Sequence, residues 1–471
     1  MKEEAMHQVA PLFEALLGYR RDPAVPFHTP GHKAGLGLEA EWRMLSDWSG
    51  LDLTEIAGLP WELALADAER LAAQLFKAEA SFFLTQGATQ GIIGGMLGAF
   101  APGATVLVAR NCHVAVIRGL ILADLKPVYV AVDSVSQWGI PAGLDIDDLA
   151  QAVKAHPEAA GLIWTNPTYQ GIASPVAPIR QIVGERVLLI DEAHGGHLDW
   201  SGLSGYEAHG QADLWVQGTH KIHGSLTQTG MLHRGRGRLN EPALRQGLEL
   251  IGTTSPSFIL LASLDSTRRF LALKGRKLFR ERLPMVADLR ERLGRLPGMT
   301  VLADPDLDRG RVLDPWKLVI ALDGWNGYQV EEVLWQRFRI QPEYADIKQV
   351  TFFIAPWQEA AALEQLFQAL AEIGRTKRQI HSRNFNPSFA IPPARLTPRA
   401  AVFAPRESVP LLRAAGRIAA ALVAPYPPGI PVLAPGELIR DQEIEGLLEI
   451  ERQGGQIRGL GPAGAIAVVK E

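Results

Sequence analysis

Short apolar runs alternate with amphipathic stretches through the first half of the chain. In Glu62–Lys77 the apolar residues recur at helical spacing, and Ser81–Leu84 follows as a short buried strand. The same alternation then repeats and predicts further elements. The predicted strands are Thr105–Val108, Pro127–Val132, Leu162–Thr165, Val187–Ile190 and the apolar run Leu214–Val216, and the predicted helices are Ile92–Phe100, Val114–Ala123, Ile146–Ala155 and Ile179–Val183.

This alternation predicts an α/β fold with a mostly parallel sheet and helices on both of its faces. In such a sheet, ligands gather at the carboxyl ends of the strands. Four groups of polar residues follow predicted strands, so we expect them to meet at one edge of the sheet. These groups are Asn111–His113, Asn166–Thr168, Asp191–His194 and Thr219–Lys221.

The second half of the chain predicts two smaller units. Ser257–Leu296 is mainly helical, and a second α/β unit follows with strands Lys317–Leu322 and Val350–Ile354, helix Tyr328–Arg337 and a helix through Ala371. The last unit is expected to contain helices Val409–Ala421 and Gln442–Gln453. We divide the chain into an N-terminal arm (1–50), a large domain (51–299), a small α/β domain (300–374), a polar, proline-containing linker (375–399) and a C-terminal domain (400–471).

Composition excludes several classes of function. The 471 residues carry a formal net charge of −4, which offers no basic surface for nucleic acid. A single cysteine, Cys112, excludes an internal disulfide. The first residues are acidic where a signal peptide is basic, and no apolar stretch is long enough to span a bilayer, so we expect a cytoplasmic protein without membrane contact. His28 and His32 are separated by Pro30 and Gly31, which prevent a helical metal pair, and we expect no metal site.

Lys221 is the residue around which the candidate chemistry is organised. It lies in the segment QGTHKIHGSLTQTGMLHRG, between His220 and further histidine, glycine and hydroxyl residues, directly after an apolar run. An amine kept neutral by burial and by cationic neighbours can form an imine with a carbonyl. Pyridoxal phosphate (PLP) is the commonest carbonyl cofactor bound in this way. A solvated lysine at the end of a strand is the simpler alternative.

Three further strand ends carry residues that suit such a cofactor. The turn at Gly87, Ala88 and Thr89 joins a strand to a helix, and the free N–H groups of a helix start suit a phosphate dianion. Asp191 can keep a pyridine nitrogen protonated, and His113 can stack on the ring. Each residue alone has a structural explanation, such as helix capping, but their joint presence at strand ends favours a cofactor site.

A set of motifs that runs in order over almost the whole chain resembles the Orn/Lys/Arg decarboxylase family, major group, of fold-type I PLP enzymes. The resemblance implies an aspartate aminotransferase-like fold and PLP-dependent decarboxylation of a basic amino acid. The motifs are FHTPGHKAG, DLTEIAGL, SFFLTQGATQG, RNCHVA, TNPTYQG, DEAHGGH, THKIHGSLTQTGMLH, TTSPS, RIQPEYAD and PYPPGIPVLAPGE.

The resemblance also implies roles for individual residues. Lys221 would hold PLP as an imine, His220 would bind phosphate or move protons, Asp191 would pair with the ring nitrogen, and His113 would stack on the ring. Glu437 would lie near the distal cation of the substrate, and Glu343 is a weaker candidate for that role. The remaining cofactor contacts would be Gly87, Ala88, Thr89, Ala193, His194, Thr219 and, from a neighbouring subunit, Thr254 and Ser255, which implies at least a dimer with shared active sites.

The sequence departs from the family pattern at three places. A segment after LTEIAGL is shortened, Gly218 occupies the place of a frequent serine, and Ala421 stands where many relatives have an acidic residue. We favour arginine over lysine and ornithine as the substrate by analogy with short relatives. Transamination or retro-aldol cleavage, and a non-catalytic PLP-binding protein, remain the alternative functions.

Overall fold

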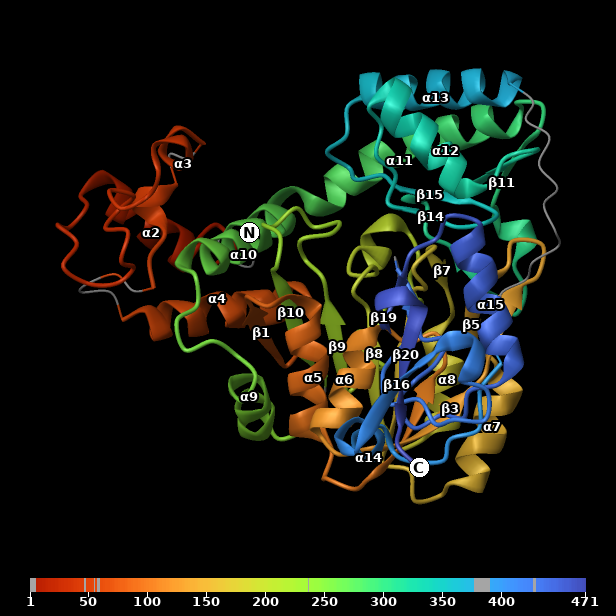
Figure 1. Ribbon diagram of the computed structural model, residues 1–471. Helices are drawn as coiled ribbons and strands as arrows, with labels where there is room; N and C mark the ends of the chain where they lie inside the picture. The colour runs from red at the N-terminus through yellow and green to blue at the C-terminus, as the bar shows by residue number, and fades with distance from the viewer. Residues whose placement is uncertain are drawn as a thin grey trace.

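The computed structural model describes residues 6–45, 48–54, 56, 60–235, 237–376, 390–426 and 429–471. Figure 1 shows a large central sheet with helices around it, a smaller unit above the sheet and a third unit beside it. The predicted linker 375–399 falls largely on residues 377–389, which lie outside the described residues, as do residues 57–59 of the shortened segment. In the ranges that the structure describes, no helix has the length and apolar character needed to cross a membrane.

The central sheet confirms the predicted α/β fold. It has seven strands in the order β1-β10-β9-β8-β6-β2-β3, and the pairs from β9 to β3 are parallel. β10 and β1 are antiparallel additions at one edge. The strands are β1 (Ala80–Leu84), β2 (Thr105–Ala109), β3 (Lys126–Val130), β6 (Gly161–Thr165), β8 (Val187–Asp191), β9 (Leu214–Gln217) and β10 (Gly230–Arg234).

Helices cover both faces of this sheet because successive strand residues point to opposite sides. Val106 and Val108 of β2 face a core that includes residues of helices α5, α6 and α9. Leu107 and Ala109 of the same strand face α7 and α8. The helices of the large domain are α4 (Trp61–Leu75), α5 (Gly87–Ala99), α6 (Val114–Leu122), α7 (Ile146–Ala155), α8 (Val176–Val183) and α9 (Glu241–Glu249). A small hairpin adds β4 (Val132–Val135) and β5 (Ile140–Leu144), and β7 (Ile172–Ala173) is a further short strand.

A long helical segment leads from the large domain to the second unit, as predicted. It consists of α10 (Phe258–Phe270), a π-helical turn at Leu271–Gly275 and α11 (Arg276–Gly294). The second unit has an antiparallel four-stranded sheet in the order β11-β13-β15-β14, which lies above the large sheet in Figure 1. Its elements are β11 (Met299–Val301), β12 (Val312–Leu313, paired with β7), β13 (Lys317–Leu322), α12 (Gly327–Val333), β14 (Tyr344–Ala345), β15 (Val350–Phe353) and α13 (Ala360–Arg375).

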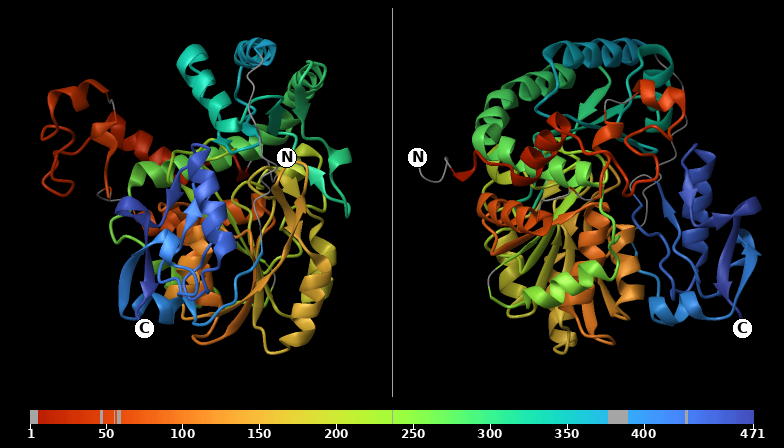
Figure 2. Two further views of the ribbon diagram at one scale, coloured as in Figure 1. Left: turned by 45° about the vertical axis from the view of Figure 1, so that its right-hand side comes forward. Right: turned by 90° about the vertical axis from the view of Figure 1, so that its left-hand side faces the viewer.

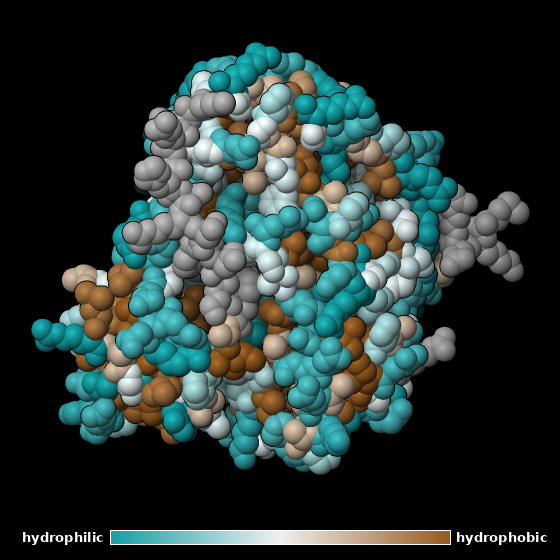
Figure 3. Space-filling model, turned by 90° about the vertical axis from the view of Figure 1, so that its right-hand side faces the viewer, coloured by the Kyte–Doolittle hydropathy of each residue, from teal (hydrophilic) through white to brown (hydrophobic). Residues whose placement is uncertain are grey.

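The C-terminal unit differs from the prediction in one element. The helix predicted over Val409–Ala421 is wrong: β16 (Arg406–Pro410) is followed by a short 3-10 turn, Leu411–Arg413. β16 pairs along its whole length with β20, and this tertiary pairing overrides the local helical pattern. The other elements are α14 (Pro398–Phe403), β17 (Ala424–Pro425), α15 (Asp441–Arg452), β18 (Ile457–Arg458), β19 (Leu460–Gly461) and β20 (Ala465–Val469). On the face of Figure 3, hydrophobic residues form several separate groups among hydrophilic ones.

The N-terminal arm combines an anchored helix with a projecting loop. Helix α2 (Pro11–Arg21) was not predicted, although Leu12, Leu16 and Tyr19 recur at helical spacing and are buried against the rest of the protein. The Leu12 backbone N–H donates to Asp265 at 2.9 Å and ties α2 to α10. The loop that follows α2 has no regular element before α3 (Ala40–Leu45), and this part projects away from the body in Figures 1 and 2.

A buried ion pair joins the large domain to the C-terminal unit. Arg110, directly after β2, donates from Nη1 to Glu437 Oε1 at 2.5 Å and from Nη2 to Glu437 Oε2 at 3.0 Å. Arg110 Nη2 also donates to the Val432 carbonyl at 2.9 Å, and the Ala434 N–H donates to Glu437 at 2.7 Å. Both charged side chains are almost fully buried, so their desolvation is offset only while each has the other as a partner.

Replacing Glu437 alone therefore destabilises the protein strongly. In Glu437→Leu the buried Arg110 guanidinium loses its counter-charge, and we expect unfolding to become easier by about 3–5 kcal/mol. The double variant Arg110→Met/Glu437→Leu should recover most of this loss, because no unpaired charge remains. The urea-unfolding midpoint measures the effect, with Asp67→Asn in the exposed pair Asp67–Arg70 as the control. An equal loss in the single and double variants would contradict the ion-pair argument.

Candidate active site

The polar residues that follow the strands meet in one cavity at the carboxyl end of the sheet. The cavity has a volume of about 310 Å³. It contains ten of the residues predicted for the site, namely Gly87, Ala88, Thr89, His113, Asp191, Ala193, His194, His220, Lys221 and Glu343. The parallel strand order explains this convergence, because β2, β6, β8 and β9 are neighbours and each ends at the same edge.

Lys221 lies on the turn after β9, with its amine enclosed in the protein. Lys221 Nζ is 2.8 Å from His194 Nε2, which is on the turn after β8. Burial lowers the pKa of Lys221, while Asp191 and Glu343 partly oppose that effect. A lower pKa increases the fraction of neutral amine, which is the nucleophilic form of a lysine.

Asp191 and His113 enter the cavity from neighbouring strands. Asp191 is the last residue of β8 and is buried, and its Oδ1 accepts the Ala193 N–H at 3.2 Å. His113 caps helix α6, where its Nδ1 accepts the Ala115 N–H at 3.2 Å. Burial lowers the pKa of His113 despite the nearby Asp191, so at neutral pH its ring is an uncharged surface.

The start of helix α5 provides a site for an anion. α5 begins at Gly87, whose φ of +71° suits glycine, and Gly87, Ala88 and Thr89 all line the cavity. The Gly87 N–H donates to the Gln228 carbonyl at 2.7 Å. The next N–H groups of the first turn have no intrahelical acceptor, and the helix dipole adds a partial positive charge there. These features suit a phosphate group.

His220 has a fixed tautomer. Its Nδ1 is 2.6 Å from the Thr229 carbonyl, which can only accept, so Nδ1 carries the proton and Nε2 has the lone pair. Burial lowers the pKa of His220, although the bond to Thr229 partly opposes the shift. A neutral imidazole with a free lone pair at the cavity can accept and return a proton.

Four predicted residues do not line this cavity. Thr219 is fully buried behind it, with Oγ1 3.4 Å from Thr229 Oγ1. Thr254 and Ser255 are exposed on the segment before α10. Glu437 uses both carboxylate oxygens to bind Arg110 and Ala434, so we do not retain it as the substrate contact of this chain.

Glu343 is the predicted acidic residue that does line the cavity. Tyr169 donates its hydroxyl to Glu343 Oε1 at 2.7 Å, and the Tyr169 ring meets the His194 ring edge to face at 4.9 Å. Burial raises the pKa of Tyr169, and the Glu343 charge adds to the shift, so Tyr169 stays a neutral donor. Glu343 thus presents a half-buried carboxylate whose position is fixed by Tyr169.

Sequence reasoning missed several residues of the site. Tyr169 and Tyr426 line the cavity and lie within motifs that were recognised, but no role was given to either. Lys317 was also missed: it is fully buried, and its Nζ is 3.1 Å from His194 Nδ1. The sequence signal that could have identified it was a lysine at the first position of an apolar strand.

The structure gives a steric reason for glycine rather than serine at position 218. A Cβ added at Gly218 would lie 3.0 Å from the Ala193 carbonyl oxygen and 3.2 Å from two carbons of the Lys221 side chain. Glycine therefore leaves room for Lys221 where a serine would crowd it.

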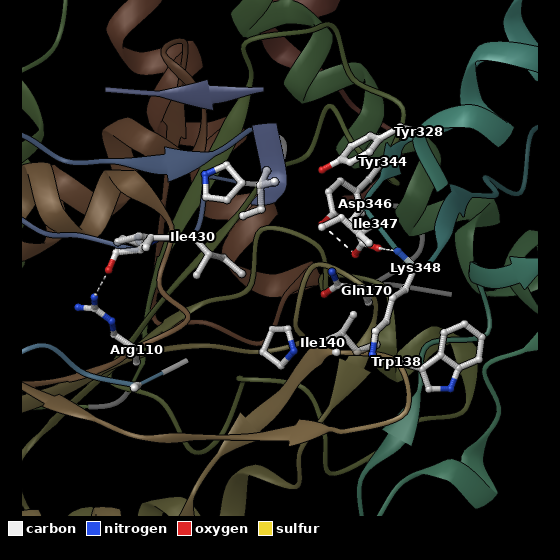
Figure 4. A pocket seen from close by; sticks show the side chains of 17 residues that line it. Arg110, Trp138, Ile140, Gln170, Tyr328, Tyr344, Asp346, Ile347, Lys348 and Ile430 are labelled. Atoms are coloured by element: carbon white, nitrogen blue, oxygen red, sulfur yellow. Dashed lines mark hydrogen bonds between the residues drawn. The ribbon is translucent and has the colours of Figure 1, made fainter. Parts of the chain in front are cut away.

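A second cavity of about 110 Å³ adjoins the first, and Pro141 and Ile430 line both. Figure 4 shows Arg110 and Ile430 on one side of it and Tyr344, Asp346 and Lys348 on the other. Asp346 accepts from the backbone N–H groups of Lys348 and Gln349 at 2.7 and 3.0 Å and from the Tyr344 hydroxyl at 3.1 Å. Its carboxylate is therefore already bound within the protein.

The chain matches models for two parts of one family. These are "Orn/Lys/Arg decarboxylase, major domain" over residues 10–339 and "Orn/Lys/Arg decarboxylase, C-terminal domain" over residues 377–456. The chain belongs to the Orn/Lys/Arg decarboxylase family of PLP-dependent carboxy-lyases and is a basic amino acid decarboxylase. It is 32% identical over 452 residues to the arginine decarboxylase of Bacillus subtilis (strain 168), covering 92% of each chain.

Solved structures show the same fold. The lysine decarboxylase LdcF of Francisella novicida gives a TM-score of 0.86 at 22% identity, over 98% of this chain and 81% of that one. The alanine–glyoxylate aminotransferase of Nostoc sp. gives 0.52 at 17% identity, over 67% of this chain and 88% of that one. The fold is therefore that of the aminotransferase-like PLP enzymes.

The residues of the cavity fit PLP. A helix start suits the phosphate, a buried carboxylate suits the ring nitrogen, and an enclosed amine suits the aldehyde. Asn111 Oδ1 and Thr165 Oγ1 belong to residues that line the cavity, are buried, and have no hydrogen-bond partner within the described part of the chain. Buried polar atoms of this kind are expected to be satisfied by a bound group.

Proposed function

We propose that the protein decarboxylates L-arginine to agmatine and carbon dioxide. The observation that carries the proposal is the presence, in one cavity, of the enclosed Lys221 amine, Asp191 and Glu343. The preference for arginine is supported by the 32% identity to an arginine decarboxylase over most of both chains. Lysine and ornithine are the alternative substrates of the family.

In the proposed reaction each residue acts through an interaction that its position allows. Lys221 would hold PLP through its amine, Asp191 would keep the ring nitrogen protonated, and Ala88 and Thr89 at the start of α5 would bind the phosphate. Bound PLP supplies an acceptor for the electrons left on the substrate Cα when carbon dioxide departs. His113 and Ala193 would confine the ring plane.

Proton return to Cα is assigned to Lys221 or His220. Both line the cavity, and the free Nε2 of His220 can take up and deliver a proton. His194 orients the Lys221 amine at 2.8 Å, so the amine stays inside the cavity rather than in solvent. Since these groups are fixed before the substrate arrives, little reorganisation is needed at the moment of reaction.

The first test offers arginine, lysine and ornithine in parallel to the purified protein with PLP. We expect carbon dioxide and agmatine from arginine, and at least tenfold lower kcat/KM with the other two amino acids, about 1.4 kcal/mol of discrimination.

Lys221→Ala should lose both product formation and the absorbance of lysine-bound PLP, whereas Lys154→Ala, at an exposed position of α7, should keep them. Turnover retained in Lys221→Ala, or formation of a keto acid in place of an amine, would contradict the proposal.

The distal cation of the substrate is assigned to Glu343. A charge-assisted hydrogen bond in a partly buried site contributes about 1.5–3 kcal/mol, and a guanidinium can bind a carboxylate through two N–H groups. Tyr169 donates to Oε1 only, and no partner for Oε2 is found among the described residues. This leaves acceptor capacity on Glu343 for a cation.

Glu343→Gln should therefore raise KM for arginine about tenfold or more, while the affinity for PLP stays the same. Glutamine keeps an oxygen that can accept from Tyr169, so the change removes the charge and leaves the local packing. Steady-state kinetics and a PLP titration measure the two effects. Glu332→Gln, at an exposed position of α12, is the matched control. An unchanged KM in Glu343→Gln would remove Glu343 from substrate recognition.

We also propose a homodimer in which each chain completes the site of the other. The arm that projects in Figures 1 and 2 exposes several large apolar side chains, including Phe27 at 93%, Val25 at 77% and Leu36 at 76%. Thr254 and Ser255 are exposed and do not line the cavity of their own chain. An apolar surface of this kind is typical of a contact between chains.

Phe27→Ser should weaken this dimer, because a large apolar contact is lost from the arm. Sedimentation velocity over a range of concentrations should show dissociation at higher concentration than in the wild type, together with weaker PLP retention. Leu412→Ser, which changes an exposed leucine of the C-terminal unit, should leave both unchanged. A wild-type protein that sediments as a monomer at all concentrations would contradict the proposed dimer.

A further inference from the structure

Two lysines contact opposite nitrogens of one histidine. Lys221 Nζ is 2.8 Å from His194 Nε2, and Lys317 Nζ is 3.1 Å from His194 Nδ1. Lys317 is the first residue of β13 in the second unit, whereas His194 and Lys221 follow strands of the large domain. His194 and Lys317 are buried, and Lys221 is half-buried at the cavity, so the contacts among the three side chains decide most of their hydrogen bonding.

The imidazole of His194 limits how much charge the two lysines can carry. Burial, helped by the neighbouring lysine charge, holds the pKa of His194 well below its usual range, so the ring is neutral. A neutral imidazole has one N–H and one lone pair, and an ammonium group can only donate. Two ammonium groups cannot both bond to this ring. One lysine must therefore be a neutral amine that accepts the imidazole N–H.

The surroundings favour Lys317 as the charged member of the pair. Lys317 Nζ lies 4.4 Å from the ring centre of Phe353 and 5.3 Å from that of Tyr169, and aromatic faces stabilise a cation at such distances. Burial lowers the pKa of Lys317 to about 8, which still leaves most of it protonated at neutral pH. His194 then accepts at Nδ1 and carries its proton on Nε2, which points at Lys221.

We propose that Lys317 is a positioning residue that acts through His194 to keep Lys221 as the neutral amine able to react with a carbonyl. The inference rests on the proposed role of Lys221 as the residue that holds PLP. It adds a residue of the second unit to the control of that amine.

The other charged groups around this trio act in both directions, and Glu343 raises the pKa of both lysines. Asp191 and Glu343 raise the pKa of Lys221, so they oppose the effect of Lys317. Asp314 binds His197 at 2.9 Å. Its negative charge raises the pKa of Lys317 and therefore favours the charged form of Lys317. The groups that face the trio are Asp191, Glu343, Asp314, His113, His220 and the hydroxyl of Tyr169.

The test measures the protonation of Lys221 in the full chain after removal of PLP. Trace labelling with acetic anhydride across a pH series, with mass spectrometry of the peptide that carries Lys221, gives the midpoint at which the amine becomes reactive. We expect a wild-type midpoint below the ordinary lysine value of about 10.4. Lys317→Met should raise the midpoint by about one pH unit, and below the midpoint PLP should add about tenfold more slowly.

Lys317→Arg is the matched variant, because arginine keeps a permanent cation in place of the lysine. Its midpoint should stay low. Lys154→Met, which removes an exposed lysine of α7, should match the wild type. If Lys317→Met does not fold, Lys317→Gln removes the charge while keeping a hydrogen-bond donor for His194, and the same rise is expected.

An unchanged midpoint in the folded neutral variants would overturn the inference, as would an equal rise in Lys317→Arg and Lys317→Met, since a loss of packing would then explain both. These outcomes are separate from failure of the proposed function. If the wild-type protein forms no lysine-bound absorbance with PLP, the role of Lys221 fails. If it does and the midpoint does not move, only the role of Lys317 fails.

Discussion

The enclosure of one lysine amine is the constraint on which the site depends. An amine removed from water loses the hydration that stabilises its charged form, and the cost of a buried ammonium is reduced if it gives up its proton. In this protein the amine of Lys221 is enclosed beside a neutral imidazole rather than in a direct ion pair with a carboxylate. Asp191 and Glu343 are near enough to influence its pKa, yet burial remains the largest effect. The arrangement favours a reactive amine over a structural ion pair.

Such a cavity requires walls from more than one unit of the chain. The sheet supplies the strand ends, but strand ends alone form an open edge. β14 and its flanking residues bring Glu343 from the second unit, and Tyr426 and Ile430 come from the C-terminal unit. The buried pair of Arg110 and Glu437 fixes the C-terminal unit against the large domain. Glu437, which does not line the cavity, therefore helps to position the cavity wall that the C-terminal unit contributes.

The sequence predicted six of the seven strands of the central sheet because each of the six is a short apolar run; β10, which contains His233 and Arg234, was not predicted. The site residues that follow from strand order, Lys221, Asp191 and His113, meet as expected. The helix expected over Val409–Ala421 failed because both of its ends pair with β20, a distant strand: Val409 and Pro410 in the ladder, and Ala419 through a bridge to Val468. Lys317 was not predicted as a site residue because its contact with His194 joins two units, and no local pattern reports such a contact.

The two acidic residues expected near the substrate show that a motif resemblance can identify candidate residues without showing which of them is available to bind a substrate. The sequence favours Glu437 over Glu343, although each lies in a recognised motif and each carries the charge that a basic substrate needs. Their surroundings separate them: Glu437 meets a guanidinium of its own chain, and its charge is already neutralised by Arg110. Glu343 meets a neutral phenol, which orients the carboxylate without cancelling its charge. We therefore infer that the preference among basic amino acids is set by the second unit and by the wall from the C-terminal unit, whereas the sheet provides the chemistry common to the family.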